Sequence, residues 1–229
     1  MSAGLKLAIF DVDGTLVDSQ GHIHAAMKVA FEDAGRVVPG RAEVLSIVGL
    51  SLPEAVARLA PDLDRAPVLD MVAVYKDAYS DIARAGGAAA SPLFEGARPA
   101  LDRLAARDDM LLGVATGKSR RGLSHIVDIH GLHDYFVTRQ DADGHPSKPH
   151  PAMVETALAE AGCAPQDAVM IGDTTFDIEM GRAAGVRTLA VGWGYHPSAR
   201  LRAAGADSLI ENIDRLAETV LDILEIADE

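Results

Sequence analysis

The chain has 229 residues, of which 48% are hydrophobic and 24% charged, so it is large and apolar enough to bury a substantial core. A formal net charge of −13 argues against nucleic acid and against an anionic membrane surface as partners. No stretch approaches the roughly 20 apolar residues that span a bilayer, and the apolar run at the amino terminus is too short for a signal peptide. With the single cysteine Cys163, which excludes an internal disulfide, these features predict a cytoplasmic protein.

One strand followed by helices is expected in roughly the first 90 residues. The apolar run at 5–10 predicts a buried strand. Apolar residues then recur at helical spacing, which predicts helices at 23–34, 41–48, 52–60 and 68–82. The small residues at 86–92, Gly-Gly-Ala-Ala-Ala-Ser-Pro, are typical of a hinge or linker.

Strands and helices alternate in the remainder of the chain. A helix is expected at 98–107, and another begins near 213. The expected strands are at 110–115, 135–138, 168–171, 188–191 and 208–210. Because helices lie between these strands, we expect a parallel sheet with both faces covered. The first strand belongs to this sheet, from which an all-helical insertion separates it.

Two carboxylates follow the first strand, in Asp11-Val12-Asp13-Gly14-Thr15. The carboxyl edge of an open α/β sheet is where ligands bind. Carboxylates this close repel each other and therefore need a cation or a shared proton. The pattern suits an aspartate nucleophile, a second aspartate as general acid/base and a divalent metal between them. An acidic turn after a strand is the alternative, because Asp-Gly is common in turns.

Three further segments carry polar residues suited to the same chemistry. The Thr116 hydroxyl and the neighbouring amides would hold a phosphoryl oxygen at a helix start, and the Lys148 ammonium would offset its charge. Asp173 and Asp177 would face one pocket and supply oxygen ligands for magnesium. Each segment also has a structural explanation, namely a helix N-cap, a solvated cation and acids in a first helical turn. Together they converge on one crevice.

These segments, in this order, resemble the four motifs of the haloacid dehalogenase superfamily: residues 11–15, Thr116, Lys148 and residues 172–177. The helical insertion resembles the cap of its phosphoglycolate-phosphatase-like branch. The resemblance implies an α/β fold, with a Rossmann-like parallel-sheet core covered by helices and an inserted all-helical cap domain. We expect the core to comprise residues 1–16 and 93–229, and the cap to comprise residues 17–92.

The resemblance also implies residue roles. Asp11 would be the nucleophile that forms an aspartyl-phosphate, and Asp13 would protonate the leaving alcohol and then activate water. The implied catalytic residues are Asp11, Asp13, Thr116 and Lys148, and the implied phosphate-binding residues are Gly14, Thr116, Gly117 and Lys148. Mg²⁺ would be bound by the Asp11 side chain, the Asp13 carbonyl and Asp173, with Asp177 in support.

The resulting hypothesis is a Mg²⁺-dependent phosphomonoesterase that hydrolyses a small phosphate ester such as 2-phosphoglycolate, as a monomer or a homodimer. A β-phosphoglucomutase-like phosphomutase and a pyrophosphatase are alternatives within the same chemistry. A receiver-type signalling module is disfavoured by the Asp-x-Asp order and by the insertion. The remaining alternative is a catalytically idle regulator that binds a partner through the cap.

Several residues near these motifs have two interpretations. Lys118 would contact an anionic part of the substrate or belong to a solvated basic helix end. Trp193 and Tyr195 would line the pocket or simply pack. In the cap, the loop 49–51 and the face at 21–25 are candidates for substrate contact. The cap carries more acids than lysines and arginines, which counts against a highly charged substrate.

Overall fold

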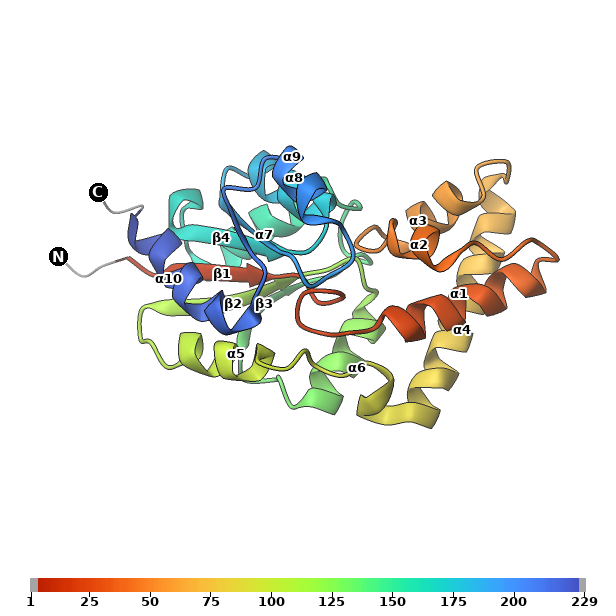
Figure 1. Ribbon diagram of the computed structural model, residues 1–229, viewed down its shortest axis with the longest axis horizontal. Coiled ribbons are helices and arrows are strands. Elements are labelled where there is room, and N and C mark those ends of the chain that lie inside the picture. The colour runs from red at the N-terminus through yellow and green to blue at the C-terminus, as the bar shows by residue number, and fades with distance from the viewer. Residues whose placement is uncertain (1–3, 227–229) are drawn as a thin grey trace.

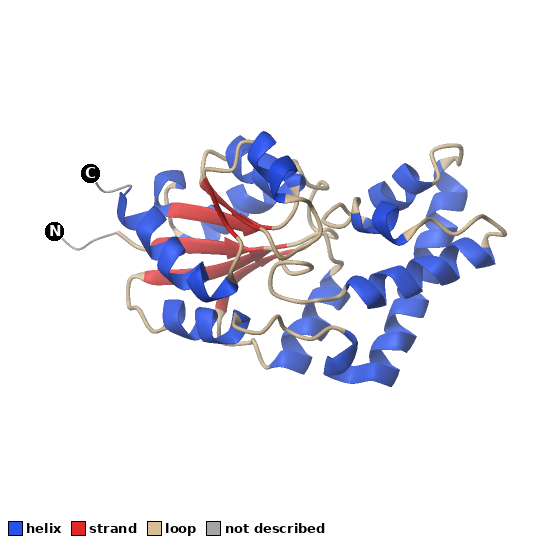
Figure 2. Ribbon diagram, in the orientation of Figure 1, coloured by secondary structure: helices blue, strands red, loops and turns tan. Residues whose placement is uncertain are grey.

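A computed structural model describes residues 4–226 of the chain (Figures 1 and 2). Within that range six strands form one sheet in the order β3-β2-β1-β4-β5-β6, and every neighbouring pair is parallel. The strands are β1 (Lys6–Phe10), β2 (Met110–Ala115), β3 (Phe136–Gln140), β4 (Ala168–Gly172), β5 (Arg187–Val191) and β6 (Ser208–Ile210). This parallel order is that of the Rossmann fold, so the predicted fold class is confirmed.

The α-helices are α1 (Gln20–Asp33), α2 (Arg41–Leu45), α3 (Leu52–Leu59), α4 (Arg65–Gly86), α5 (Ala97–Ala105), α6 (Arg120–His130), α7 (Ala152–Ala161), α8 (Thr175–Ala183), α9 (Ser198–Ala203) and α10 (Leu216–Ile226). Short 3₁₀ helices are η1 (Gly87–Ala90), η2 (Pro165–Asp167) and η3 (Ile213–Arg215). In the part of the chain that the structure describes, no helix has both the length and the apolar character needed to cross a membrane.

Helices cover both faces of the sheet because alternate residues of each central strand point to opposite sides. On β1, Ala8 and Phe10 belong to the apolar cluster formed with α5, α6 and α10. Leu7 and Ile9 belong to the cluster formed with α7 and α8. All five residues of β1 are buried, which explains why residues 7–10 of this strand are a continuous apolar run in the sequence.

The helices α1 to α4 lie within the predicted cap and form an apolar core of their own. Their cluster includes Ile23, Met27, Phe31, Val56 and Val72. Figure 1 shows this helical unit beyond the carboxyl ends of the strands, at the right of the view. The spacing of apolar residues therefore identified the buried face of α1 and α4, and the cap boundaries at 17 and 92 stay a prediction.

The clearest differences from the predicted bounds are at 41–48, where α2 ends at Leu45, and at 86–92 and 135–138. The segment 86–92 was expected to be a hinge or linker, and in the structure α4 continues to Gly86 and residues 87–90 form η1. Alanine favours helical backbone, and Gly87 separates the two helices with a φ of +53°. The third strand was expected at 135–138, but it extends to Gln140, where it still pairs with Ala115 of β2. Pairing with the neighbouring strand, rather than apolar character, determines where β3 ends.

Candidate active site

The first motif follows the central strand of the sheet. β1 lies between β2 and β4, so Asp11 comes next to the segments that carry Thr116 and Asp173. The turn at Gly14 has a φ of +86°, and a Cβ there would lie 2.2 Å from Oδ2 of Asp173. Glycine is therefore required for backbone conformation and for space, and it allows the first and fourth motifs to approach closely.

Three carboxylates meet below this turn. Asp11, Asp173 and Asp177 are buried, and each contributes an oxygen that lies within 4.8 Å of the other two. Burial raises the pKa of Asp11 to about 7 and raises the pKa of Asp173 well above its ordinary value, in both cases assisted by the charge of Asp177. The cluster is therefore stabilised either by protonation of a carboxylate or by a bound cation.

Lys148 supplies part of that positive charge. Its side chain has 0% exposure, and its Nζ lies 2.8 Å from Oδ1 of Asp11 and 2.6 Å from Oδ1 of Asp177. Burial by itself would lower the pKa of Lys148, but the charges of the two aspartates outweigh it and hold the pKa above its ordinary value. Three ionised carboxylates and one ammonium leave a net charge of −2, because −3 + 1 = −2.

The donor set fits a divalent cation. Oδ2 of Asp11 is buried and has no hydrogen-bond partner among the described residues. An unsatisfied buried carboxylate oxygen is costly, and a hard cation with oxygen ligands would both satisfy it and neutralise the net charge. Asp173 is already oriented by the Thr15 hydroxyl at 3.1 Å and by the Tyr195 amide at 2.8 Å. Such supporting bonds hold metal ligands in place.

Mg²⁺ is expected to stabilise the protein against unfolding, and Asp173→Asn is expected to remove that effect. Binding to the folded state alone would contribute about 2.7 kcal/mol at roughly 100 times the Kd. The measurement is the shift in thermal midpoint with added MgCl₂, which requires no turnover. Asp143→Asn, outside the cluster, should keep the full shift. Equal shifts for Asp173→Asn and wild type would contradict a ligand role for Asp173.

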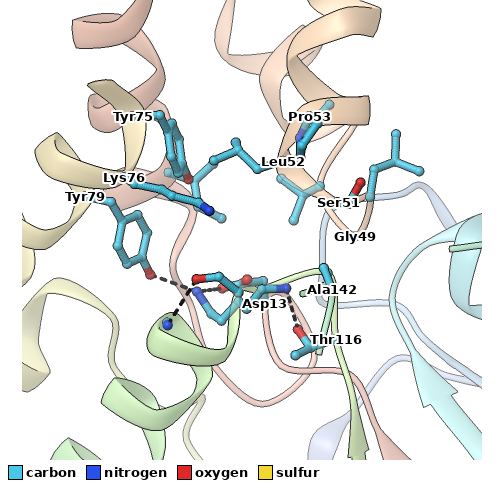
Figure 3. A pocket seen from close by; sticks show the side chains of 18 of the residues that line it. Asp13, Gly49, Ser51, Leu52, Pro53, Tyr75, Lys76, Tyr79, Thr116 and Ala142 are labelled. Atoms are coloured by element: carbon cyan, nitrogen blue, oxygen red, sulfur yellow. Dashed lines mark hydrogen bonds and ion pairs between the residues drawn. The ribbon is translucent and has the colours of Figure 1, made fainter. Parts of the chain in front are cut away.

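Asp13 is held by groups from both the core and the cap. Its Oδ1 accepts a hydrogen bond from the Ser19 hydroxyl and lies 3.0 Å from Nζ of Lys118. The Lys118 side chain is 7% exposed, and its ammonium also donates to the hydroxyl of Tyr79 on α4 at 2.8 Å (Figure 3). Lys118 is thus neither solvated nor free, so the interpretation as a solvated cation is wrong, and contact with an anionic part of the substrate stays a prediction. The sequence did not identify Tyr79 as a residue of the site.

The second motif lies directly under the cap loop. Thr116 is buried, and its hydroxyl accepts from the Lys118 amide at 3.3 Å. A Cβ on Gly117 would lie 2.5 Å from the carbonyl oxygen of Gly49, so the cap loop packs against this glycine. The Ser51 amide donates to the Ser147 hydroxyl at 2.8 Å. The cap is therefore closed onto the core, and the roles of Thr116 and Gly117 in phosphate binding stay predictions.

Three other predicted residues, Gly14, Trp193 and Tyr195, have hydrogen-bond partners within the protein. Gly14 donates its N–H to the carbonyl of Val17 at 2.9 Å, so this amide is engaged in the turn. Trp193 donates to the carbonyl of Thr15 at 3.1 Å, and the Tyr195 hydroxyl accepts from the Ser19 amide at 3.2 Å. The loop after β5 therefore holds the backbone of the first motif and of Ser19 in place. The position of this loop after a strand indicated that it lies near the site but did not indicate these bonds.

A cavity of about 220 Å³ lies between the cap and the core. Asp11, Asp13, Thr116 and Gly117 contribute to its core side, so four of the predicted residues meet there. Gly49–Ser51 and Ile23 line it from the cap, and their contact with substrate stays a prediction. Lys148, Asp173 and Asp177 are not among its lining residues and lie buried beside Asp11.

Comparison with known proteins finds relatives that are named as phosphatases or as pyrophosphatases. The chain is 30% identical to pyrophosphatase PpaX of Bacillus pumilus over 82% of this chain and 84% of that protein. It is 27% identical to phosphoglycolate phosphatase of Nitrosococcus oceani over 91% and 93% of the two chains. Its fold is similar to the crystal structure of a predicted phosphatase from Clostridium acetobutylicum, with a TM-score of 0.83, 24% identity and coverage of 96% and 100%.

The family assignment rests on a match over most of the chain. The profile of the haloacid dehalogenase-like hydrolases matches residues 8–191, which include all four motifs. The two relatives are named a pyrophosphatase and a phosphoglycolate phosphatase, and both are hydrolases, so the chain is a hydrolase rather than a receiver-type signalling module. The resemblance inferred from the motifs is confirmed, and the chain belongs to the haloacid dehalogenase-like hydrolase family.

Proposed function

We propose that this protein is a Mg²⁺-dependent phosphomonoesterase that works through an aspartyl-phosphate on Asp11. The observation that carries the proposal is the meeting of Asp11 and Asp13 in one cavity, with Lys148 and the carboxylates of Asp173 and Asp177 buried beside Asp11. A nucleophile, an acid/base and charge compensation for a phosphoryl group are then available together.

In the first step, a carboxylate oxygen of Asp11 attacks phosphorus and the bond from phosphorus to the alcohol oxygen breaks. Asp13 donates its proton to that oxygen as the alcohol leaves. In the second step, Asp13 takes a proton from water, which attacks the same phosphorus. The bond to Asp11 breaks, inorganic phosphate leaves and Asp11 is regenerated. Thr116, Gly117 and Lys148 would orient the phosphoryl oxygens.

The metal would be held by Asp11, Asp173 and the carbonyl of Asp13, with Asp177 in support. When bound, Mg²⁺ would supply positive charge to the phosphoryl oxygens. Lys148 would keep the carboxylate of Asp11 ionised and in place through its contact of 2.8 Å. The closed cap would exclude bulk water from the phosphorylated aspartate.

Lys118→Met is expected to impair alkyl phosphates more than nitrophenyl phosphate. Its ammonium holds Oδ1 of Asp13 at 3.0 Å, and an alkyl alcohol needs the proton that Asp13 delivers. We expect kcat to fall by about 10²-fold for an alkyl phosphate and by about tenfold or less for nitrophenyl phosphate.

Arg121→Met is the matched control for this prediction. Arg121 is also a cation that bonds to α4, at Ser80, but it has no contact with Asp13 among the described residues. We expect it to reduce both substrates by one small, common factor. Equal losses for both leaving groups in Lys118→Met would show that Lys118 does not act through Asp13.

The test of the proposed function is phosphate release from a panel of esters, with Mg²⁺ and with a chelator. 2-Phosphoglycolate belongs in the panel because several relatives are named phosphoglycolate phosphatases. Inorganic pyrophosphate is the second candidate, because the relative at 30% identity is named a pyrophosphatase. Analysis of sugar phosphate products separates a phosphatase, which releases phosphate, from a mutase. Absence of release from every compound would contradict hydrolysis and favour the idle regulator.

A further inference from the structure

The cavity between cap and core has two chemically different walls. Its core side carries Asp11, Asp13 and Thr116, where the phosphoryl group would lie. Its cap side is formed largely by apolar side chains, among them Ile23, Met27, Ile47, Val48, Leu50 and Leu52. Figure 3 shows Leu52 and Pro53 of α3 across the cavity from Tyr75 and Lys76 of α4, above Asp13. The group bonded to phosphate would therefore extend between apolar walls.

Two of the polar side chains on the cap side, Tyr79 and Ser80, already have hydrogen-bond partners within the protein. The Tyr79 hydroxyl accepts from Lys118 at 2.8 Å, and the Ser80 hydroxyl accepts from Arg121. Lys76 is exposed to solvent. Against the apolar side chains of this wall, a sugar hydroxyl would lose its hydrogen bonds to water without a replacement, which costs free energy for each unpaired group.

We propose that the alcohol of the natural ester has an apolar body of several carbons, which the cap side of this cavity binds. The inference rests on the proposed phosphomonoesterase function and narrows its substrate class. Water remains the second reactant, and the apolar alcohol leaves with the proton of Asp13, so the reaction needs no other component. Binding of the apolar body would also displace water from the wall next to the phosphoryl group.

A chain-length series measures this directly. The probes are ethyl, butyl and hexyl phosphate, bound in the presence of Mg²⁺ to the Asp11→Asn variant, which should not consume them. Each buried methylene should tighten the Kd by about fourfold, so hexyl phosphate should bind on the order of 10²-fold more tightly than ethyl phosphate. 2-Phosphoglycolate and glucose 6-phosphate should bind more weakly than hexyl phosphate. A Kd that does not change with chain length would overturn the inference.

Leu52→Gln and Leu59→Gln, each combined with Asp11→Asn, form a matched pair. Both leucines belong to α3, both are half-buried and both pack against the cap cluster, but Leu52 lines the cavity and Leu59 does not. Leu52→Gln should weaken hexyl phosphate about tenfold and leave ethyl phosphate unchanged. Leu59→Gln should change neither. An equal loss in both variants would overturn the assignment of this wall as the binding surface.

Turnover of the wild-type enzyme with the same esters separates the two proposals. A steep binding series without phosphate release from any ester would overturn the proposed hydrolysis, and with it the status of these esters as substrates. A flat binding series together with efficient turnover of 2-phosphoglycolate would overturn the apolar assignment alone. Hydrolysis of hexyl phosphate with a higher kcat/KM than ethyl phosphate supports both.

Discussion

Asp11→Asn is expected to lower kcat by about 10⁴-fold or more, because the amide oxygen cannot form the phosphorylated intermediate that the reaction requires. The fold should survive the change. Asparagine has nearly the same shape, and it removes one negative charge from a buried cluster of three carboxylates. Because buried like charges are costly, the free energy of unfolding in the absence of metal should be unchanged or higher. The variant should therefore lose activity without losing stability.

The measurement for Asp11→Asn combines phosphate release with denaturant unfolding of the same preparation. Loss of activity together with loss of stability would indicate a damaged fold and would not support the assignment of Asp11 as the nucleophile. Turnover within about tenfold of the wild-type rate would contradict the covalent mechanism, since no other residue is assigned to attack phosphorus.

Lys148→Met is expected to lower the free energy of unfolding by about 3–5 kcal/mol in the absence of metal. The change removes the cation that lies within 2.8 Å of Asp11 and 2.6 Å of Asp177, and it leaves two buried carboxylates without that compensation. Methionine has a similar length and fills most of the same volume, so the loss would report charge more than packing. Phosphate release should also fall severely.

Lys28→Met is the matched control for this stability measurement. Lys28 pairs with Glu32 at 3.6 Å, but both side chains are 55% exposed. Exposed pairs contribute little, so the loss should stay below about 1 kcal/mol. Similar losses for the two lysines would contradict the view that Lys148 compensates a buried charged cluster.

The centre of the sheet was predictable because β1 and β4 are buried on both faces. A strand of that kind is largely an apolar run bounded by turn residues, as is the neighbouring β2 at 110–115, whose bounds the structure confirms. The helical structure within the predicted hinge or linker at 86–92 was not predictable in this way. Its alanines are compatible with either loop or helix, and the outcome depends on continuation from the long helix α4.

The sequence predicted which site residues meet where those residues follow neighbouring strands. It did not predict contacts between residues that are far apart in the chain and lie on different elements. Asp11, Asp173 and Asp177 follow neighbouring strands, so their meeting could be inferred from the parallel sheet. The contact between Lys118 and Tyr79 joins residues that are 39 positions apart on different elements. No periodicity indicates such a pair. Likewise, apolar periodicity shows that a cap helix has a buried face but does not distinguish packing in the cap core from lining the cavity.

The most direct test of the central claim is whether the phosphoryl group becomes bonded to Asp11. The Asp13→Asn variant, supplied with Mg²⁺ and nitrophenyl phosphate, should form the intermediate without needing an acid and should hydrolyse it slowly, because the base is missing. After an acid quench, peptide mass spectrometry should find one added HPO₃ group on the peptide that contains Asp11, and none in the Asp11→Asn protein. Phosphate release by a protein whose Asp11 peptide is unmodified at every time point would contradict the account.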